Sequence, residues 1–268
     1  MARPLLGRLS NSAVNIMSKW LLKNSRMKRF KFVFDVESIS GLQMLALVEE
    51  LLSKFSSPKV FFLHGFEVDV KTLEKKILKK KSWPSGLVSG GFELRFGLLP
   101  ALGYCFLVIE ESEGHSNTKL EEGIKPILCV EGFIQAWVSD VEYDFWQNAT
   151  DPLEYECVGR PLTGLPMKSN GLPPPLDQME IDTSGNPGRN VLRQGYIEAI
   201  GSTMWLGNLF WERAGVDRIA SISLLESQGI KVYECDRFFK IITSDKVFSD
   251  GSVVEKQRAL RRILFGLS

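Results

Sequence analysis

Histidine and cysteine, the side chains that most often hold metals or act as nucleophiles, are scarce in this sequence. The chain of 268 residues has two histidines, His64 at the end of an apolar run and His115 in a polar loop. Neither has a cysteine, an aspartate or a second histidine at metal-ligand spacing. The four cysteines, Cys105, Cys129, Cys157 and Cys235, lack CxxC spacing and a nearby histidine. We therefore predict structural histidines, free thiols in a reducing compartment and no metal site.

Motifs for nucleophilic catalysis or phosphate binding are also missing from the sequence. It contains no G-x-S-x-G elbow, no GxxxxGK[ST] loop and no GxGxxG after a strand. Gly90-Gly91 precedes an expected strand rather than a helix, so no helix N-terminus is there to receive a phosphate. A Ser–His or Cys–His dyad formed in space stays open, because its partners need not be close in sequence. We predict no catalytic and no cofactor-binding residues.

Carboxylates and aromatic residues concentrate between residues 140 and 156, where no lysine or arginine occurs. Paired carboxylates could serve a glycosidase-like hydrolysis or bind a hard cation. Acidic residues interleaved with aromatic ones also suit a partner-binding surface, because aromatic rings anchor a partner and carboxylates select and steer a basic one. An ordinary solvated surface is the third interpretation. The predicted partner-binding residues are Asp140, Glu142, Tyr143, Asp144, Trp146, Asp151, Glu154 and Glu156.

The charge is segregated along the chain although the formal net charge is only +1. Residues 1 to 81 carry 16 Lys and Arg against 7 Asp and Glu, a net charge of +9. Residues 110 to 156 carry 12 Asp and Glu against 2 Lys, a net charge of −10. The overall balance excludes a strongly basic nucleic-acid binder, whereas the segregation can steer a charged partner or be neutralised across the fold.

Hydrophobic periodicity predicts the elements that must position these side chains. Strands are expected at Lys28–Val36, Val60–Leu63 (buried), Phe92–Phe96, Tyr104–Glu110, Phe133–Ser139, Tyr196–Thr203, and in a hairpin of Ile230–Cys235 with Phe238–Ile242. Helices are expected at Leu42–Phe55, Val68–Lys80, Lys119–Cys129 and Arg218–Gln228, and after a capping box at Ser252–Glu255. This order predicts the α+β class, with a mixed, mainly antiparallel sheet packed against several helices in a single compact unit.

The expected organisation is a basic N-terminal extension, residues 1–26, followed by one domain over residues 27–268. Residues 161 to 176 contain five prolines and are expected to form a stiff, extended crossover. This crossover could join two sub-lobes, residues 27–160 and 176–268. No stretch approaches the length of about 20 apolar residues that a membrane span requires, and no continuous apolar signal region is visible, so a cytoplasmic location is expected.

The stretch 200–215, IGSTMWLGNLFWERAG, holds two of the six tryptophans. A strand that ends near Gly207, followed by the start of a helix, would fold Trp205 and Trp211 onto one core. We therefore predict core packing rather than a cofactor site for this stretch.

The C-terminal third also contains motifs that resemble a known family. They are Asn186-Pro-Gly-Arg189, Gly195-Tyr196, Ile200-Gly201, Met204-Trp-Leu-Gly207 and Phe210-Trp211 with Gly215. Together they resemble the immunity protein 52 family of bacterial polymorphic toxin and type VI secretion systems. The likeness covers residues 186 to 265, and in residues 28 to 185 only the order of elements agrees.

The resemblance implies an intracellular, non-enzymatic antitoxin, encoded beside a toxin with a restriction-endonuclease-like nuclease domain. The implied partner is this cognate nuclease toxin, with no direct nucleic-acid or membrane binding. The acidic segment from Asp140 to Glu156 could then occupy the basic nuclease cleft as a phosphate mimic. A carboxylate-dependent hydrolase and an adaptor or scaffold protein are the alternatives.

Overall fold

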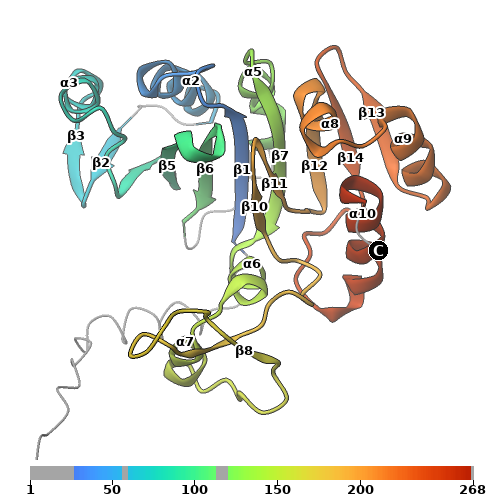
Figure 1. Ribbon diagram of the computed structural model, residues 1–268. Coiled ribbons are helices and arrows are strands. Elements are labelled where there is room, and N and C mark those ends of the chain that lie inside the picture. The colour runs from blue at the N-terminus through green and yellow to red at the C-terminus, as the bar shows by residue number, and fades with distance from the viewer. Residues whose placement is uncertain (1–26, 56–59, 113–119, 267–268) are drawn as a thin grey trace, which may run out of the picture.

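The computed structural model describes residues 27–55, 60–112 and 120–266, and the predicted extension 1–26 lies outside these residues. It confirms the α+β class (Figure 1). In the described part of the chain, ten strands form one antiparallel sheet in the order β13-β14-β12-β7-β1-β6-β5-β4-β2-β3. These strands are β1 (Lys28–Asp35), β2 (Phe61–Leu63), β3 (Phe66–Val68), β4 (Leu87–Ser89), β5 (Phe92–Leu99), β6 (Tyr104–Glu111), β7 (Phe133–Asp140), β12 (Thr203–Gly207), β13 (Lys231–Glu234) and β14 (Phe238–Ile242).

Two hydrophobic cores lie on opposite faces of this sheet. Phe30, Phe32 and Phe34 of β1 point into the first core, whereas Val33 points into the second, because successive side chains of a strand alternate. The first core is covered by α2 (Gly41–Ser53), α3 (Val70–Lys80), α4 (Leu120–Gly123) and α5 (Lys125–Leu128). The second is covered by α8 (Asn208–Ala214), α9 (Arg218–Ser227) and α10 (Val254–Phe265). The helices that cover the first core lie toward the N-terminal strands of the sheet, and those that cover the second core lie toward its C-terminal strands (Figure 1).

Several element boundaries differ from the sequence expectation for local reasons. The helix expected from Val68 begins at Val70, because Val68 pairs in β3 and the Asp69 side chain caps the helix. The capping box expected at Ser252–Glu255 is wrong. Asp250 accepts the backbone N–H of Ser252 and caps a short 3₁₀ turn, η2 (Gly251–Val253), before α10 starts.

The strand Val60–Leu63 was expected to be buried on both faces, which is also wrong. Phe61 points into the first core, but Phe62 on the opposite face is 39% exposed. Strand β2 lies next to the last strand of the sheet, β3, and no helix of the described residues covers this face of it. A short apolar run near the edge of a sheet therefore has the same sequence pattern as a buried strand.

The two tryptophans of the stretch 200–215 are buried as expected but in different cores. Strand β12 ends at Gly207 and α8 begins at the next residue, which confirms the predicted strand–helix junction. Trp205 is 2% exposed in the first core, and Trp211 is 5% exposed in the second. The shared core was a wrong prediction, because Trp205 points to the opposite side of β12 from Met204 and Leu206.

Gly207 lets β12 approach β7 closely, which makes its substitution a test of the fold. A Cβ atom at this position would lie 2.4 Å from the backbone oxygen of Phe133, in the adjacent strand. Gly207→Ala is therefore expected to lower the free energy of unfolding by about 2–3 kcal/mol through overpacking. Gly185→Ala is the matched control, since a Cβ there meets nothing within 4 Å, and a change below about 1 kcal/mol is expected. Equal urea midpoints for the two variants would contradict the close approach.

The proline-rich segment turns back on itself instead of running as a simple crossover. It contributes β8 (Met167–Ser169), which pairs with β9 (Met179–Ile181) in a separate hairpin. A second small ladder joins β10 (Val191–Arg193) to β11 (Tyr196–Glu198). Strand β12 then pairs with β7, so residues from both expected sub-lobes share the main sheet. In the described residues, no helix has the length and apolar character needed to cross a membrane.

Candidate partner-binding site

The acidic segment 140–156 folds into two short consecutive helices, α6 (Val141–Asn148) and α7 (Pro152–Cys157). An aspartate caps each of them. Asp140 Oδ1 accepts the backbone N–H of Tyr143 at 2.8 Å, and Asp151 Oδ1 accepts that of Leu153 at 2.9 Å. Two of the predicted partner-binding carboxylates therefore start helices, where a side-chain oxygen satisfies otherwise unpaired N–H groups.

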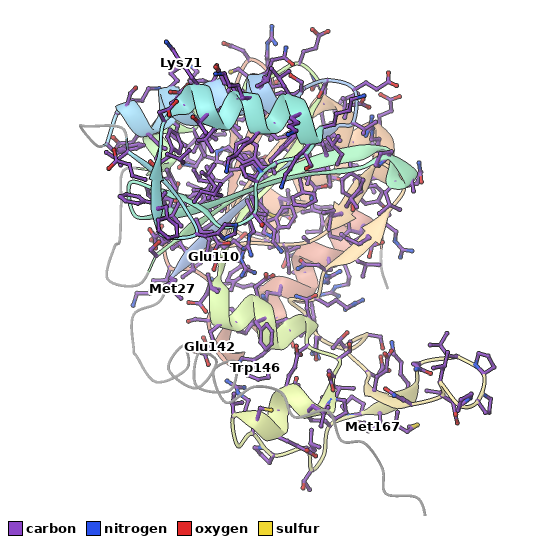
Figure 2. All side chains as sticks on the ribbon, turned by 90° about the vertical axis from the view of Figure 1, so that its left-hand side faces the viewer. Met27, Lys71, Glu110, Glu142, Trp146 and Met167 are labelled. Carbon is purple, nitrogen blue, oxygen red and sulfur yellow. The ribbon has the colours of Figure 1, made fainter. Side chains whose placement is uncertain are left out.

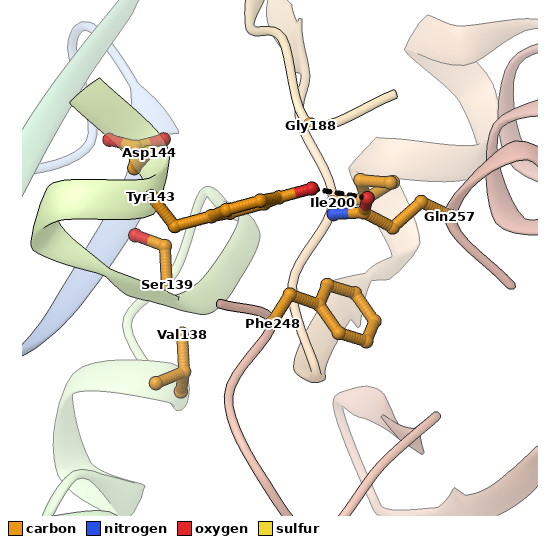
Figure 3. Close-up of a pocket in the computed structure, with 8 residues that line it drawn as sticks. All are labelled: Val138, Ser139, Tyr143, Asp144, Gly188, Ile200, Phe248 and Gln257. Atoms are coloured by element: carbon orange, nitrogen blue, oxygen red, sulfur yellow. Dashed lines mark hydrogen bonds between the residues drawn. The ribbon is translucent and has the colours of Figure 1, made fainter. Parts of the chain in front are cut away.

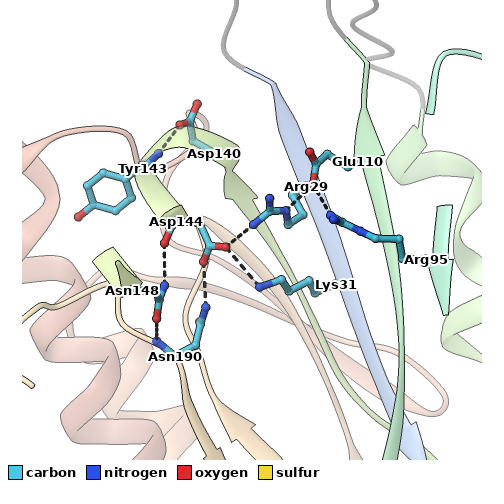
Figure 4. A network of polar contacts seen from close by, with 9 residues as sticks. All are labelled: Arg29, Lys31, Arg95, Glu110, Asp140, Tyr143, Asp144, Asn148 and Asn190. Atoms are coloured by element: carbon cyan, nitrogen blue, oxygen red, sulfur yellow. Dashed lines mark hydrogen bonds and ion pairs between the residues drawn. The ribbon is translucent and has the colours of Figure 1, made fainter. Parts of the chain in front are cut away.

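Asp144 lies at the centre of a buried polar network between α6 and β1 (Figure 4). Its Oδ2 accepts Arg29 Nη1 at 2.6 Å and Lys31 Nζ at 3.3 Å. Its Oδ1 accepts the side-chain amide of Asn190 at 3.0 Å. The backbone oxygen of Asp144 accepts Asn148 Nδ2 at 2.7 Å, and Asn148 Oδ1 in turn accepts the backbone N–H of Asn190 at 2.6 Å. The carboxylate thus holds α6 to the sheet and to the 186–190 segment.

A second buried carboxylate extends this network along the sheet. Glu110 Oε2 accepts Arg29 Nε at 2.8 Å and Arg95 Nη2 at 2.6 Å. The strand register places these groups on the face of β1, β6 and β5 that is opposite to the first core. The network therefore pairs charged groups that would otherwise be buried without a partner on this face of the sheet.

The pKa values of the network follow from burial and charge. Burial alone would raise the pKa of Asp144, but the charges of Lys31 and Arg29 prevail and hold it below its ordinary value. Burial lowers the pKa of Lys31, and Asp144 opposes that shift only in part. The pKa of Arg29 is raised, since Glu110 and Asp144 outweigh the desolvation of its guanidinium. Asp144 is therefore ionised and fully paired near neutral pH.

Tyr143 and Trp146 anchor α6 on its two sides. The Tyr143 hydroxyl donates to Gln257 Oε1 of α10 at 2.8 Å, across a cavity that Asp144 and Phe248 also line (Figure 3). The volume of this cavity is about 10 Å³, which is room for about one water molecule and far below the range of about 300–1,000 Å³ typical of small-molecule sites. The Trp146 ring packs edge-on to Tyr155 at 4.7 Å, and the Arg160 guanidinium lies 4.1 Å from its centre.

The remaining predicted residues reach solvent and define what we call the α6–α7 acidic surface. Its members are Glu142, Asp151, Glu154 and Glu156, of which Glu154 is half-buried. Leu153 of α7, which precedes Glu154, has 56% of its surface exposed. Burial and the neighbouring Asp151 raise the pKa of Glu154. Helices α6 and α7 lie beyond the ends of the strands of the main sheet (Figure 2, near the labels Glu142 and Trp146).

The predicted residues thus divide into two groups. Asp140, Asp144 and Trp146 are buried and Tyr143 is half-buried, so these four build the helices, whereas the acidic surface carries the charges that a partner can reach. Sequence reasoning did not identify Arg29 and Lys31 as partners of Asp144. The available signal was the alternation of β1, which puts both cations on one face, two residues apart.

Comparison with known proteins gives no assignment. No family model, curated protein or solved structure matches this chain. The resemblance to the immunity protein 52 family stays a prediction that rests on the motifs of residues 186–265. Among the described residues, no three or more His, Cys, Asp or Glu side chains are grouped so that they could hold a metal ion.

Proposed function

We propose that this protein is a non-enzymatic antitoxin that binds a cognate nuclease toxin through the α6–α7 acidic surface. The observation that carries the proposal is that four carboxylates, Glu142 of α6, Asp151 at the start of α7, and Glu154 and Glu156 of α7, reach solvent on two consecutive helices, together with the exposed Leu153 of α7. A nuclease cleft is basic because it must hold phosphate, and exposed carboxylates complement it. An exposed apolar side chain beside such carboxylates supplies anchoring contacts.

The buried residues of the segment support the same function in a different way. Asp140 and Asp144 fix α6, and Trp146 with Tyr155 fixes α7 against it. A surface whose backbone is ordered before binding loses little conformational entropy in the complex. The α6–α7 acidic surface is therefore preorganised for a partner.

A hydrolase is less well supported by the same geometry. Glycoside hydrolysis needs two carboxyl groups that flank the scissile bond. Among the described residues that line the cavity beside Tyr143, Asp144 is the one carboxylate, and two cations pair with it. A carboxylate held in this way is a poor general base or acid, because its proton affinity is lowered and its oxygens are occupied.

The decisive experiment is co-expression with the product of the neighbouring gene. If the protein is an antitoxin, it is expected to restore the growth of cells that make this product and to co-purify with the product as a complex. Loss of toxicity without a complex, or a complex without rescue, would favour an enzyme or an adaptor. Failure of both rescue and co-purification would refute the proposal.

Charge reversal of the acidic surface tests where the partner binds. The triple variant Glu142→Lys, Glu154→Lys and Glu156→Lys is expected to slow association at least about tenfold at low salt, because carboxylates steer a basic partner. The dependence of the association rate on salt should fall with it, measured by surface plasmon resonance. The matched control is Glu212→Lys, Glu226→Lys and Glu234→Lys, which reverses three exposed charges on α8, α9 and β13. Equal association rates for both triple variants would place the partner elsewhere.

A further inference from the structure

The β8–β9 hairpin ends in a loop, residues 170–178, that projects from the rest of the protein (Figure 2, beyond Met167). The sequence of this loop, NGLPPPLDQ, presents two leucines on either side of three prolines. Leu172 is 51% and Leu176 is 61% exposed. Met167 and Met179, which share one face of the hairpin, are exposed as well, so the strands add two exposed apolar side chains to those of the loop.

The loop is held in one shape by its own hydrogen bonds. Asn170 Oδ1 accepts the backbone N–H groups of Leu172 at 3.1 Å and Gln178 at 3.2 Å, and Asn170 Nδ2 donates to the Leu176 oxygen at 3.0 Å. The backbone N–H of Asn170 donates to the Gln178 oxygen at 2.9 Å, and that of Leu176 to the Pro173 oxygen at 2.9 Å. The prolines restrict φ further. One asparagine therefore closes the loop across its base and fixes both leucines.

This combination is typical of a binding loop. Two leucines exposed to water do not gain the free energy that burial would provide, and the loop has no core of its own to cover them. A loop that is already ordered loses little entropy when a partner covers it. Apolar anchors that enter a pocket of the partner account for most of the affinity in such interfaces, and the flexible Met167 and Met179 can adapt to its rim.

The charge and position of the hairpin indicate what kind of partner covers the two leucines. Residues 167–182 contain Lys168 against Asp177, Glu180 and Asp182, a net charge of −2. The root of the hairpin is joined to the acidic surface, because Ile181 packs in one small core with Trp146 and Tyr155. The hairpin and the α6–α7 acidic surface thus have the same sign and the same support, and fit a single basic partner.

We infer that the loop 170–178 inserts Leu172 and Leu176 into an apolar pocket beside the basic cleft of the nuclease toxin. This inference rests on the proposed function. The acidic surface would then govern the rate of association, and the loop would govern the lifetime of the complex, because rim charges act mainly on association and buried anchors on dissociation.

The test is the affinity of the full chain for the product of the neighbouring gene, measured by surface plasmon resonance. The variant Leu172→Ser with Leu176→Ser is expected to raise Kd about 100-fold, mainly through faster dissociation. Asn170→Ala keeps both leucines but releases the loop, and is expected to raise Kd about tenfold. The matched control, Ile219→Ser with Leu224→Ser, removes two leucine-sized exposed side chains from α9 and should leave Kd unchanged.

Each outcome decides between the inference and the proposed function. If the wild-type chain binds and the leucine variant binds equally well, the inference is refuted and the antitoxin proposal stands. If the wild-type chain does not bind the product, both are refuted. Sedimentation of the chain alone tests whether a second copy of the chain, instead of a toxin, covers the loop. A dimer that becomes a monomer in the leucine variant would overturn the assignment to a toxin.

Discussion

Replacing Asp144 by alanine is expected to lower the free energy of unfolding by about 3–5 kcal/mol, the range for removing one partner of a buried ion pair. The variant removes the carboxylate that pairs with Lys31 and leaves Arg29 with one of its two carboxylate partners, Glu110. It also removes the acceptor of Asn190. Urea denaturation at neutral pH measures the change.

Glu142→Ala is the matched control for this variant. Glu142 precedes Asp144 by two residues on α6, but its side chain is 55% exposed and its partner Arg160 is 43% exposed. A loss below about 1 kcal/mol is expected for such a pair. If both variants had the same urea midpoint, Asp144 would not be the anchor that its contacts indicate.

The pH dependence of Asp144 has a definite sign. Its folded pKa lies below the ordinary value of 3.8, so its contribution to stability is present above that value and is lost as the pH falls through the folded pKa. The difference in stability between the wild-type chain and Asp144→Asn should therefore narrow as the pH is lowered below about 4. A difference that stays constant down to pH 2 would contradict the lowered pKa.

The local elements of the fold were predictable, whereas their long-range pairings were not. The alternation of phenylalanine with charged residues predicted β1, and the apolar spacing from Leu42 predicted α2. The partners of Asp144 lie 115 residues away in Arg29 and 113 in Lys31. Periodicity describes which face a residue occupies, but not which strand lies beside it.

The same limit explains why the acidic segment was interpreted as a single surface. A run of carboxylates without a cation nearby in sequence reads as solvated. Asp140 and Asp144 are buried because α6 follows directly on the central strand β7, which brings its first turn against the cations of β1. Charge reversal of Asp144 would thus test the fold, and only the exposed carboxylates can test partner binding.

The proline-rich segment shows a further limit. Its composition predicted a stiff, extended crossover, and the β8–β9 hairpin contradicts the extended course. The reversal depends on Asn170, whose side chain accepts backbone N–H groups on both sides of the prolines. A single Asx-type contact of this kind is easily missed beside three consecutive prolines.

Arg261→Ala is expected to destabilise the protein about as much as Asp144→Ala, by about 3–5 kcal/mol. Arg261 lies on α10 with 4% of its surface exposed. Its guanidinium donates to the backbone oxygens of Pro187, Arg189 and Glu198, so one side chain satisfies three carbonyl groups of residues 187–198. Burial lowers the pKa of Arg261 to about 10, which leaves it charged at neutral pH.

Arg258→Ala, one turn earlier on α10, is the control, because the Arg258 side chain is 56% exposed and pairs with the exposed Glu255. A loss below about 1 kcal/mol is expected for this variant. Arg261→Lys should be intermediate, since an ammonium group cannot reproduce the planar fork that spans three oxygens. Amide hydrogen exchange should localise the defect to residues 187–198. Because Asn190 donates to Asp144, loosening this segment should also speed exchange at the start of α6. Unchanged protection in both regions would mean that Arg261 does not hold the motif segment on which the family resemblance rests.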